Sequence, residues 1–135
     1  MRFLDTNILL CSISPTRGEE NKRSIAEALL AHEDCVLSVQ VLQEFYVQAT
    51  RPSRPDALSH ENAAALMESW MRFRIQDVTV AILRHALHLK ERYRFSYWDC
   101  TILSAACATG CDVLYSEDLS HEQVIEGVRI VNPFR

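Results

Sequence analysis

The stretch from residue 2 to residue 10, RFLDTNILL, constrains the fold most strongly. A short apolar run from Phe3 ends at Asp5, Thr6 and Asn7, and apolar residues then resume. Because the side chains of Asp, Thr and Asn accept hydrogen bonds from the free amides of a helix N-terminus, the stretch predicts a strand, a sharp turn and a helix start. Asp5 then lies at the carboxyl end of a strand, where open α/β sheets bind ligands. A helix-capping role and a functional role for Asp5 are about equally consistent with this stretch alone.

Length and composition limit the class of protein. The chain has 135 residues, 48% hydrophobic and 24% charged, which is typical of a globular protein and predicts one domain over residues 1–135. No apolar run approaches the ~20 residues that cross a bilayer. Asp5 and Asn7 also interrupt the only N-terminal stretch that could resemble a signal segment. We therefore expect a cytoplasmic protein without a membrane partner.

The charge and the cysteines exclude further classes. A net charge of −4 argues against a protein that coats nucleic acid by electrostatics, but it allows an enzyme that gathers carboxylates around a divalent cation. The five cysteines are odd in number and form no C-x-x-C pair, so neither a disulfide framework nor a zinc ribbon is indicated. Small buried thiols are the favoured interpretation.

Helices and strands are expected to alternate along the chain. Apolar periodicity and turn residues predict helices at residues 7–11, 19–32, 39–50, 59–72, 79–92 and 96–109. Strands are predicted at residues 35–37, 73–78, 112–115 and 128–131, with the first strand ending at Asp5. This alternation predicts a central short parallel sheet with helices on both faces, a three-layer α/β fold.

Three further acidic residues stand out. Glu44 belongs to a polar stripe with Gln40 and Gln48, which is a solvated face unless it borders a wet cleft. Asp99 begins an almost wholly apolar helix, where a carboxylate is costly unless it is paired, although Ser96 offers it a local capping role. Asp118 follows a strand in the same way as Asp5, and a helix start is predicted after it.

The four carboxylates together predict a cation site. If Asp5, Glu44, Asp99 and Asp118 share one crevice, their mutual repulsion requires a cation. Hard oxygen ligands favour Mg²⁺ or Mn²⁺, which activate water and stabilise charge on a phosphodiester.

The ordered motifs resemble one known family. The segments FLDTN (3–7), the helix of Glu44, SYWD (96–99) with its alanine-rich continuation and LYSEDL (114–119) look like the motifs of PIN-domain ribonucleases. The likeness spans essentially the whole chain, and it is greatest to the VapC-type toxins of bacterial toxin–antitoxin pairs. The resemblance implies a PIN-like fold and a metal-dependent endoribonuclease that acts on RNA.

The resemblance also implies roles for individual residues. Asp5, Glu44, Asp99 and Asp118 correspond to the acidic catalytic positions; Asp5, Asp99 and Asp118 would hold the metal, and Thr6, Asn7 and Ser116 would support the cluster. The family pattern of a hydroxyl, any residue and an acid selects Asp118 over its neighbour Glu117. A cognate antitoxin protein and a homodimer are the implied partners, with Tyr46 and Trp70 as possible anchors for an antitoxin helix.

Two other functions remain open at this stage. A catalytically silent PIN-like module could bind RNA or protein without cutting it. A phosphatase could use Asp5 as a nucleophile, but such enzymes usually carry a second aspartate two residues later, where this chain has Asn7. Basic residues that could contact a phosphate backbone are Arg51, Arg54, Lys90, Arg92 and Arg94.

Overall fold

The computed structural model describes all residues from 1 to 135 and contains one six-stranded sheet. The strand order is β3-β2-β1-β4-β6-β5, and every neighbouring pair is parallel except β5 and β6. The strands are short: β1 (Arg2–Leu4), β2 (Cys35–Ser38), β3 (Arg74–Gln76), β4 (Val113–Tyr115), β5 (Val124–Ile125) and β6 (Val128–Val131). The α/β class and the mostly parallel sheet expected from the sequence are confirmed.

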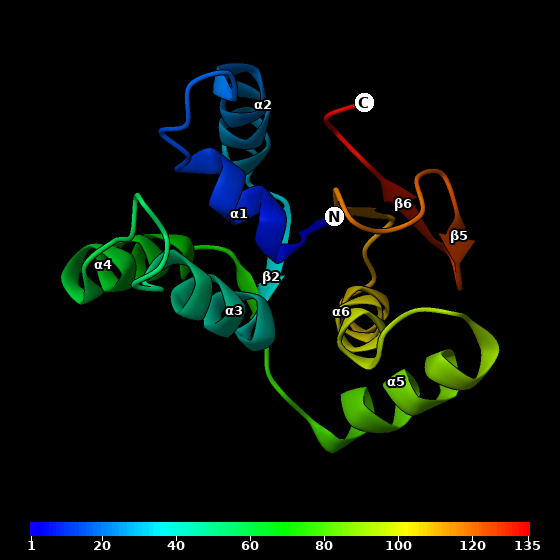
Figure 1. Ribbon diagram of the computed structural model, residues 1–135. Coiled ribbons are helices and arrows are strands. Elements are labelled where there is room, and N and C mark those ends of the chain that lie inside the picture. The colour runs from blue at the N-terminus through cyan, green and yellow to red at the C-terminus, as the bar shows by residue number, and fades with distance from the viewer.

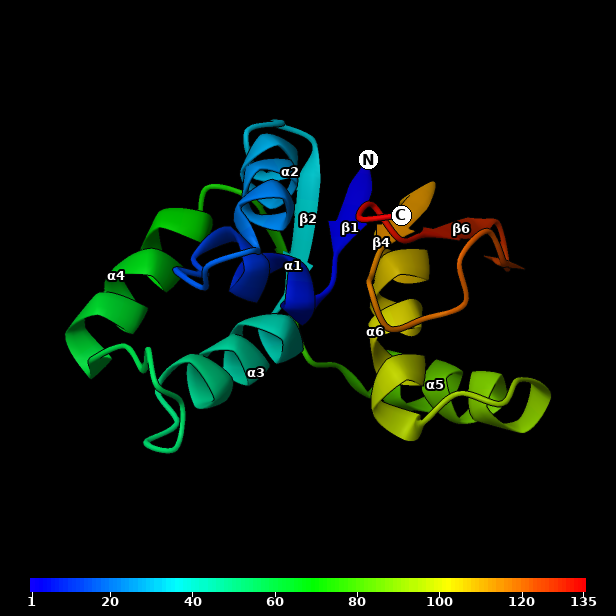
Figure 2. The ribbon, with the colours of Figure 1, turned by 45° about the horizontal axis from the view of Figure 1, so that its top comes forward.

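Helices cover both faces of this sheet. The six helices are α1 (Thr6–Ser12), α2 (Glu20–Leu30), α3 (Val39–Ala49), α4 (His60–Trp70), α5 (Val80–Arg92) and α6 (Tyr97–Ala108). Figures 1 and 2 show α1 to α4 on one side of the strands and the packed pair of α5 and α6 on the other. The arrangement has the three layers that the alternating pattern predicted.

The direction in which the chain adds strands to the sheet reverses between β1 and β4. The chain continues from β1 to β2 on one side, and β4 pairs with the opposite edge of β1, with Leu4 beside Tyr115. In open α/β sheets a crevice forms at such a reversal, outside the carboxyl ends of the strands. The residues that follow β1 and β4 therefore meet at one edge of the sheet.

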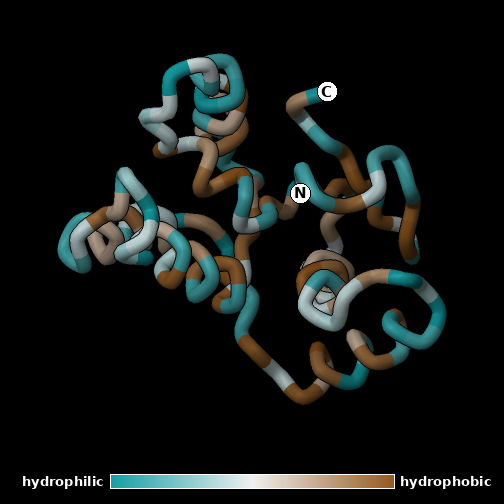
Figure 3. The backbone as a smooth tube through the Cα atoms, in the orientation of Figure 1, coloured by the Kyte–Doolittle hydropathy of each residue, from teal (hydrophilic) through white to brown (hydrophobic).

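Helix α6 is the central helix of the core. Seven of its residues are buried: Cys100, Thr101, Ile102, Leu103, Ser104, Ala105 and Ala106. It packs on α5 and also contacts β2, β4 and β6. Its C-terminus follows the predicted pattern, because Gly110 has φ +70°, a left-handed conformation that side-chain-bearing residues adopt only with strain. Helix α5 is amphipathic, and its backbone alternates between hydrophilic and hydrophobic residues in Figure 3.

The predicted helix after Asp118 is wrong. Residues 116–123 form a loop, which leads to β5, a strand that the sequence analysis missed. β5 and β6 form a hairpin whose two turn residues, Glu126 and Gly127, have φ values of +47° and +86°. A two-residue turn with both φ values positive matches the right-handed twist of paired strands. Glu is not among the residues that usually signal this turn, so only Gly127 hinted at it.

The structure also bears on the expectations for Trp70, for the cysteines and for membrane-spanning segments. Trp70 is only 4% exposed and packs edge-to-face on Phe45, with ring centroids 4.8 Å apart, so it is a core residue and not an anchor for a partner. All five cysteines are free thiols, three of them buried and two half-buried. None of the helices has the length and apolar character needed to cross a membrane.

Candidate active site

Asp5 lies at the end of β1 and is almost completely buried, with 5% of its surface exposed. The backbone N–H of Thr6 donates a hydrogen bond to Oδ1 at 2.7 Å, and the hydroxyl of Ser116 donates to Oδ2 at 2.8 Å. Burial raises the pKa of Asp5 to about 6, because a charged carboxylate loses its water shell there. The two hydrogen bonds lower this pKa, whereas the nearby Glu44 and Asp99 carboxylates raise it. Asp5 is therefore both a helix cap and a carboxylate destabilised by its surroundings.

The loop after β4 is tied to α1 by Asn7. Its side-chain amide donates to Oδ2 of Asp118 at 3.0 Å, and its carbonyl oxygen accepts a hydrogen bond from the backbone N–H of Glu117 at 3.2 Å. The buried hydroxyl of Ser116 also accepts a hydrogen bond from the N–H of Asp118 at 3.2 Å. Ser116 therefore contacts both Asp5 and the backbone of Asp118. These bonds bring the ends of β1 and β4 into one polar network.

The two adjacent acids of this loop point to different partners. Asp118 is exposed and accepts the amide of Asn7, whereas Glu117 forms an ion pair with Lys22 of α2. An engaged Glu117 is less available to the other carboxylates. This geometry favours Asp118 as the member of the cluster.

Glu44 reaches the same network from α3. Its Oε2 accepts a hydrogen bond from the hydroxyl of Thr6 at 2.7 Å, and its Oε1 accepts one from the amide of Gln40 at 2.9 Å. The polar stripe of α3 borders a hollow of about 510 Å³ that is lined by Gln40, Gln43, Glu44, Val47, Gln48, Arg51 and Trp98. The stripe therefore lines a wide, open groove, which agrees with the interpretation that Glu44 borders a wet cleft.

Asp99 approaches from the N-terminus of α6. The hydroxyl of Ser96 caps this helix by accepting a hydrogen bond from the N–H of Asp99 at 3.1 Å. Asp99 is half-buried, and its pKa is raised by burial, lowered by Ser96 and raised again by the nearby Asp118 and Glu44 carboxylates. Asp99 and Asp5 thus both experience the repulsion of Glu44. The four predicted acids come from the end of β1, α3, α6 and the loop after β4, and they are near enough for their charges to repel one another.

The donor set suits a divalent cation in chemistry and charge. None of the four carboxylates forms an ion pair with Lys, Arg or His, and their oxygens are the hard ligands that Mg²⁺ and Mn²⁺ prefer. The pKa of Asp5 is raised mainly by burial and further by the Glu44 and Asp99 carboxylates, so a nearby cation would stabilise its charged form. No three of these side chains, however, lie close enough together to form a metal site on their own. The residues thus fit the ion, while the structure contains no closed coordination sphere.

Two residues near the acids were missed by the sequence analysis. The amide of Gln40 donates to Glu44 and to the backbone carbonyl of Trp98, and its carbonyl oxygen accepts the hydroxyl of Thr101. Gln40 was assigned only to the polar stripe, and Thr101 was not singled out at all. A hydroxyl residue within the buried face of an otherwise apolar helix is the signal that could have identified Thr101.

The predicted basic residues are spread over two places. Arg51 borders the hollow beside Glu44, while Lys90, Arg92 and Arg94 lie exposed at the end of α5 and in the loop before α6. Arg54 is engaged with Asp56 at 3.1 Å. Arg51 is therefore the predicted cation that adjoins the acidic cluster.

Comparisons with known proteins agree with this geometry. A model of the PIN domain family matches residues 2–126. Among curated protein sequences, none matches this chain at a significant level. The chain is similar in fold to a toxin–antitoxin complex from Klebsiella pneumoniae, with 22% identity, 98% coverage of both chains and a TM-score of 0.71.

Two further solved structures share the fold. Mycobacterium tuberculosis VapC20, described as a sarcin–ricin loop cleaving toxin, is 21% identical over 84% of this chain and 87% of its own, with a TM-score of 0.65. FitAcB from Neisseria gonorrhoeae is 18% identical over 99% of both chains, with a TM-score of 0.69. At these identities the structural likeness establishes the fold alone.

Proposed function

The chain belongs to the PIN domain family, and on that premise we propose that it is a metal-dependent endoribonuclease that hydrolyses RNA phosphodiester bonds. One observation carries the proposal most directly. Four carboxylates from separate elements lie near the carboxyl edge of β1 and β4 and repel one another, and none has a cationic partner. Such an arrangement is costly for a protein unless a cation binds there.

The side chains have distinct roles in this proposal. Asp5, Asp99 and Asp118 would hold Mg²⁺ or Mn²⁺, and Glu44 would bind it or orient water beside it. When bound, the cation would activate water and stabilise charge on the scissile phosphate.

The supporting residues hold these carboxylates in place. Thr6 fixes Glu44, Asn7 fixes Asp118, and Ser116 fixes Asp5 through the hydrogen bonds described above. Residues 1–135 would act as a single nuclease domain.

The decisive test is cleavage that depends on metal and on Asp5. Purified protein should cut RNA with Mg²⁺ or Mn²⁺ and stop when a chelator is added, and Asp5→Asn should cut more slowly, by on the order of 100-fold or greater. Metal should also raise the melting temperature of the wild type, because a ligand that binds only the folded state stabilises it. Asp5→Asn should show a smaller shift, while Asp112→Asn, an exposed acid near the opposite end of β4, should behave as the wild type.

The rival function is a catalytically silent module that binds RNA or protein. It predicts RNA binding without chelator-sensitive cleavage and an equal effect of metal on the wild type and Asp5→Asn. The cationless cluster favours the nuclease, because a binding module has no need to retain four repelling acids at one edge.

We also propose that the protein is the toxin of a type II toxin–antitoxin system. The fold similarity to toxin–antitoxin proteins and the unbalanced acidic cluster support this, since an antitoxin arginine could satisfy the carboxylates with its fork of donors. Expression of the wild type alone should arrest growth by cleaving cytoplasmic RNA. Asp99→Asn should relieve the arrest at equal protein level, and a harmless wild type at that level contradicts the toxin assignment.

A homodimer remains part of the proposal, and one surface supports it. Val80, Leu83 and Leu87 are exposed on α5 at the spacing of a single helix face. An exposed apolar stripe of this kind suits a second protein chain. Leu87→Glu should shift the chain from dimer to monomer in sedimentation, whereas Val124→Glu, an exposed apolar position on β5, should not.

A further inference from the structure

Two hollows adjoin the acidic cluster and share Gln40, Gln43 and Trp98. The first is the hollow of about 510 Å³ along α3 described above, here named the α3 groove. The second, named the α6 pocket, has a volume of about 140 Å³ and lies between α3, the segment after β3, α5 and α6. Trp98 therefore lies between the α3 groove, which Glu44 lines, and the α6 pocket, which Glu44 does not line.

Trp98 is exposed but held in place. Its side chain has 63% of its surface exposed, and its indole contacts the ring of Tyr97 edge-to-face at 5.2 Å and 72°. Its backbone carbonyl accepts hydrogen bonds from the amide of Gln40 at 3.2 Å and the hydroxyl of Thr101 at 2.6 Å. The same Gln40 amide donates to Glu44, as described above. The side chain of Gln40 thus links the backbone at Trp98 to Glu44 of the acidic cluster.

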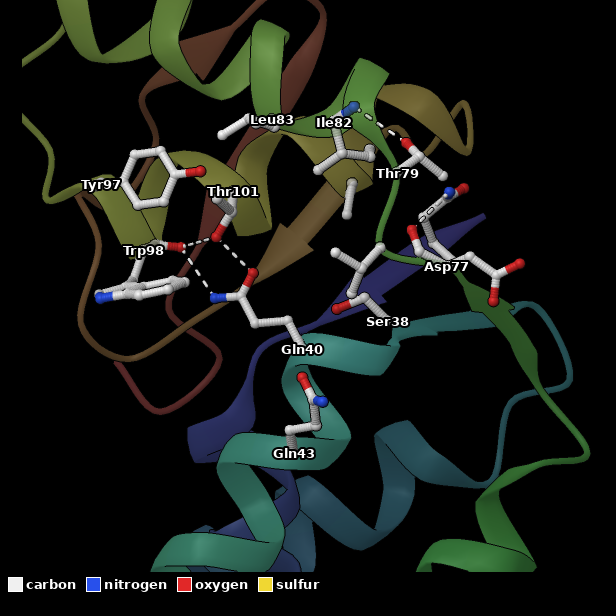
Figure 4. A pocket seen from close by; sticks show the side chains of 13 residues that line it. Ser38, Gln40, Gln43, Asp77, Thr79, Ile82, Leu83, Tyr97, Trp98 and Thr101 are labelled. Carbon is white, nitrogen blue, oxygen red and sulfur yellow. Dashed lines mark hydrogen bonds between the residues drawn. The ribbon is translucent and has the colours of Figure 1, made fainter.

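The α6 pocket has the size of one six-membered ring. A protein cavity of about 150 Å³ accommodates benzene, and the α6 pocket has nearly that volume. Figure 4 shows Tyr97 and Trp98 on one side of the pocket, Gln40 and Gln43 below, and Thr79, Asp77 and Ile82 on the far side. Aromatic and apolar walls with a few polar groups suit a flat heterocycle that is both stacked and hydrogen-bonded.

Gln43 is the polar group available to such a ring. All atoms of the Gln40 amide are already engaged with Glu44, Trp98 and Thr101. The side-chain amide of Gln43, one turn further along α3, has no hydrogen-bond partner and offers both a donor and an acceptor. Asp77 adds a carboxylate, which repels a phosphate but accepts hydrogen bonds from a base. The pocket chemistry therefore favours a nucleobase over a phosphate group.

We propose that the α6 pocket binds one unpaired pyrimidine of single-stranded RNA, stacked on Trp98 and contacted by Gln43, beside the phosphodiester that faces the acidic cluster. This inference rests on the proposed nuclease function and adds the substrate class. The base must be unpaired, because a base within a duplex is already stacked and cannot enter a pocket. Arg51, exposed and without an ion pair, follows the C-terminus of α3 and lines the α3 groove together with Glu44, where it would contact the continuing RNA backbone.

The test is RNA binding measured without catalysis. Labelled hexanucleotides of uridine and of adenosine are titrated into metal-free, chelator-treated protein at low ionic strength, and the anisotropy is recorded. Stacking of one base on an aromatic residue, by alanine substitution, corresponds to an affinity loss of about 5- to 140-fold. Trp98→Ala should show this loss for the uridine probe, Trp98→Phe should retain most of the affinity, and Val124→Ala, a distant exposed apolar residue, should match the wild type.

Two additional measurements identify the base contact. Gln43→Ala should bring the affinities for the uridine and adenosine probes closer together, because it removes the group that contacts the base edge. RNA should quench the fluorescence of the wild type but not of Trp98→Phe, whose remaining Trp70 is only 4% exposed. If Gln43→Ala leaves the difference in affinity between the two probes unchanged, the contact of Gln43 with the base is contradicted. If RNA quenches the fluorescence of Trp98→Phe as it does that of the wild type, the contact with Trp98 is contradicted.

The outcomes separate this inference from the nuclease proposal. Wild-type binding that is unchanged by Trp98→Ala, or equal for the two probes, overturns the pyrimidine site even if the protein cleaves RNA. In that case the α6 pocket would be a site for a protein partner and not for a base. Conversely, if uridine binding depends on Trp98 but neither Mg²⁺ nor Mn²⁺ supports cleavage of RNA, the nuclease proposal is overturned and the pyrimidine site is retained.

Discussion

Two neighbouring parallel strands of this protein end in a carboxylate, yet the two carboxylates differ in environment. Asp5 follows β1 directly and is 5% exposed, whereas Asp118 lies three residues after β4 and is exposed. The two carboxylates are followed by different elements. After Asp5 the chain enters α1 at once, while after Asp118 it continues as a loop toward β5. Asp5 also accepts a hydrogen bond from Ser116, which lies 111 residues later in the chain, so its burial reflects tertiary packing as well as the element that follows its strand.

The two sites are joined through Ser116. Its hydroxyl donates to Asp5 and accepts from the backbone of Asp118, so it belongs to both environments. The buried site carries the electrostatic cost, because burial raises the pKa of Asp5 to about 6. Four experiments can sharpen or break this comparison.

The largest expected effect is on cleavage. Asp5→Asn and Asp118→Asn should both reduce metal-dependent RNA cleavage, and Asp5→Asn should reduce it more, by on the order of 100-fold or greater, which corresponds to ~3 kcal/mol of transition-state stabilisation. The buried carboxylate interacts more strongly with a cation because less water screens it. Initial rates at saturating metal measure both effects. A larger loss in Asp118→Asn contradicts the ranking.

The second prediction concerns stability against pH without metal. The folded-state pKa of Asp5, about 6, exceeds the unfolded value of 3.8, so folding favours its protonated form. The stabilisation is complete below pH 3.8 and is lost as the pH rises through 6, by roughly 2–3 kcal/mol for this group. Asp5→Asn should remove that part of the pH dependence in chelator-treated protein. Denaturant titrations at several pH values give the difference between the two proteins.

Asp118→Asn is the matched control for the pH experiment. It also replaces a strand-end aspartate with its amide, but the carboxylate that it removes is surrounded by water. Asp118→Asn should therefore change the pH profile of stability less than Asp5→Asn does. If both variants flatten the profile equally, the contrast between the two strand ends is incorrect.

The third prediction concerns Ser116. Ser116→Ala removes the donor to Asp5 and leaves one buried carboxylate oxygen without it, which costs about 1–3 kcal/mol. The pKa of Asp5 should rise further, since the hydrogen bond from Ser116 lowers it in the wild type. The destabilisation should be greater at pH 8 than at pH 5 and should shrink in the Asp5→Asn background. Equal destabilisation at both pH values would mean that Ser116 stabilises only the loop after β4 and does not stabilise the charged form of Asp5.

The smallest expected effect is that of Glu117→Gln. This change weakens an ion pair with Lys22 whose two side chains are partly exposed, and such pairs contribute about 0–1 kcal/mol. Cleavage should remain close to that of the wild type, in contrast to Asp118→Asn. A loss of activity as large as that of Asp118→Asn would assign Glu117 to the cluster.

The local elements could be predicted because their signals are local. Ser38, Ser59, Thr79 and Ser96 each cap the helix that the sequence analysis placed after them. The strand that ends at Asp5 and the helix that ends before Gly110 follow from apolar runs and turn residues in the same way. The helix predicted after Asp118 failed because Ser-Glu-Asp is equally suited to a loop, and no local signal distinguishes the two.

The sequence by itself determined the alternation of strands and helices, and with it the parallel sheet and the position of Asp5 and Ser116 at strand ends. Capping bonds and apolar periodicity act within a few residues, so they are legible in a single chain. Only the tertiary structure decided that Asp5 is buried while Asp118 is exposed, that Glu44 borders a groove, and that Gln40 connects Glu44 to Trp98. Those properties depend on which segments pack over a side chain, and the packing partners lie tens of residues away in the sequence.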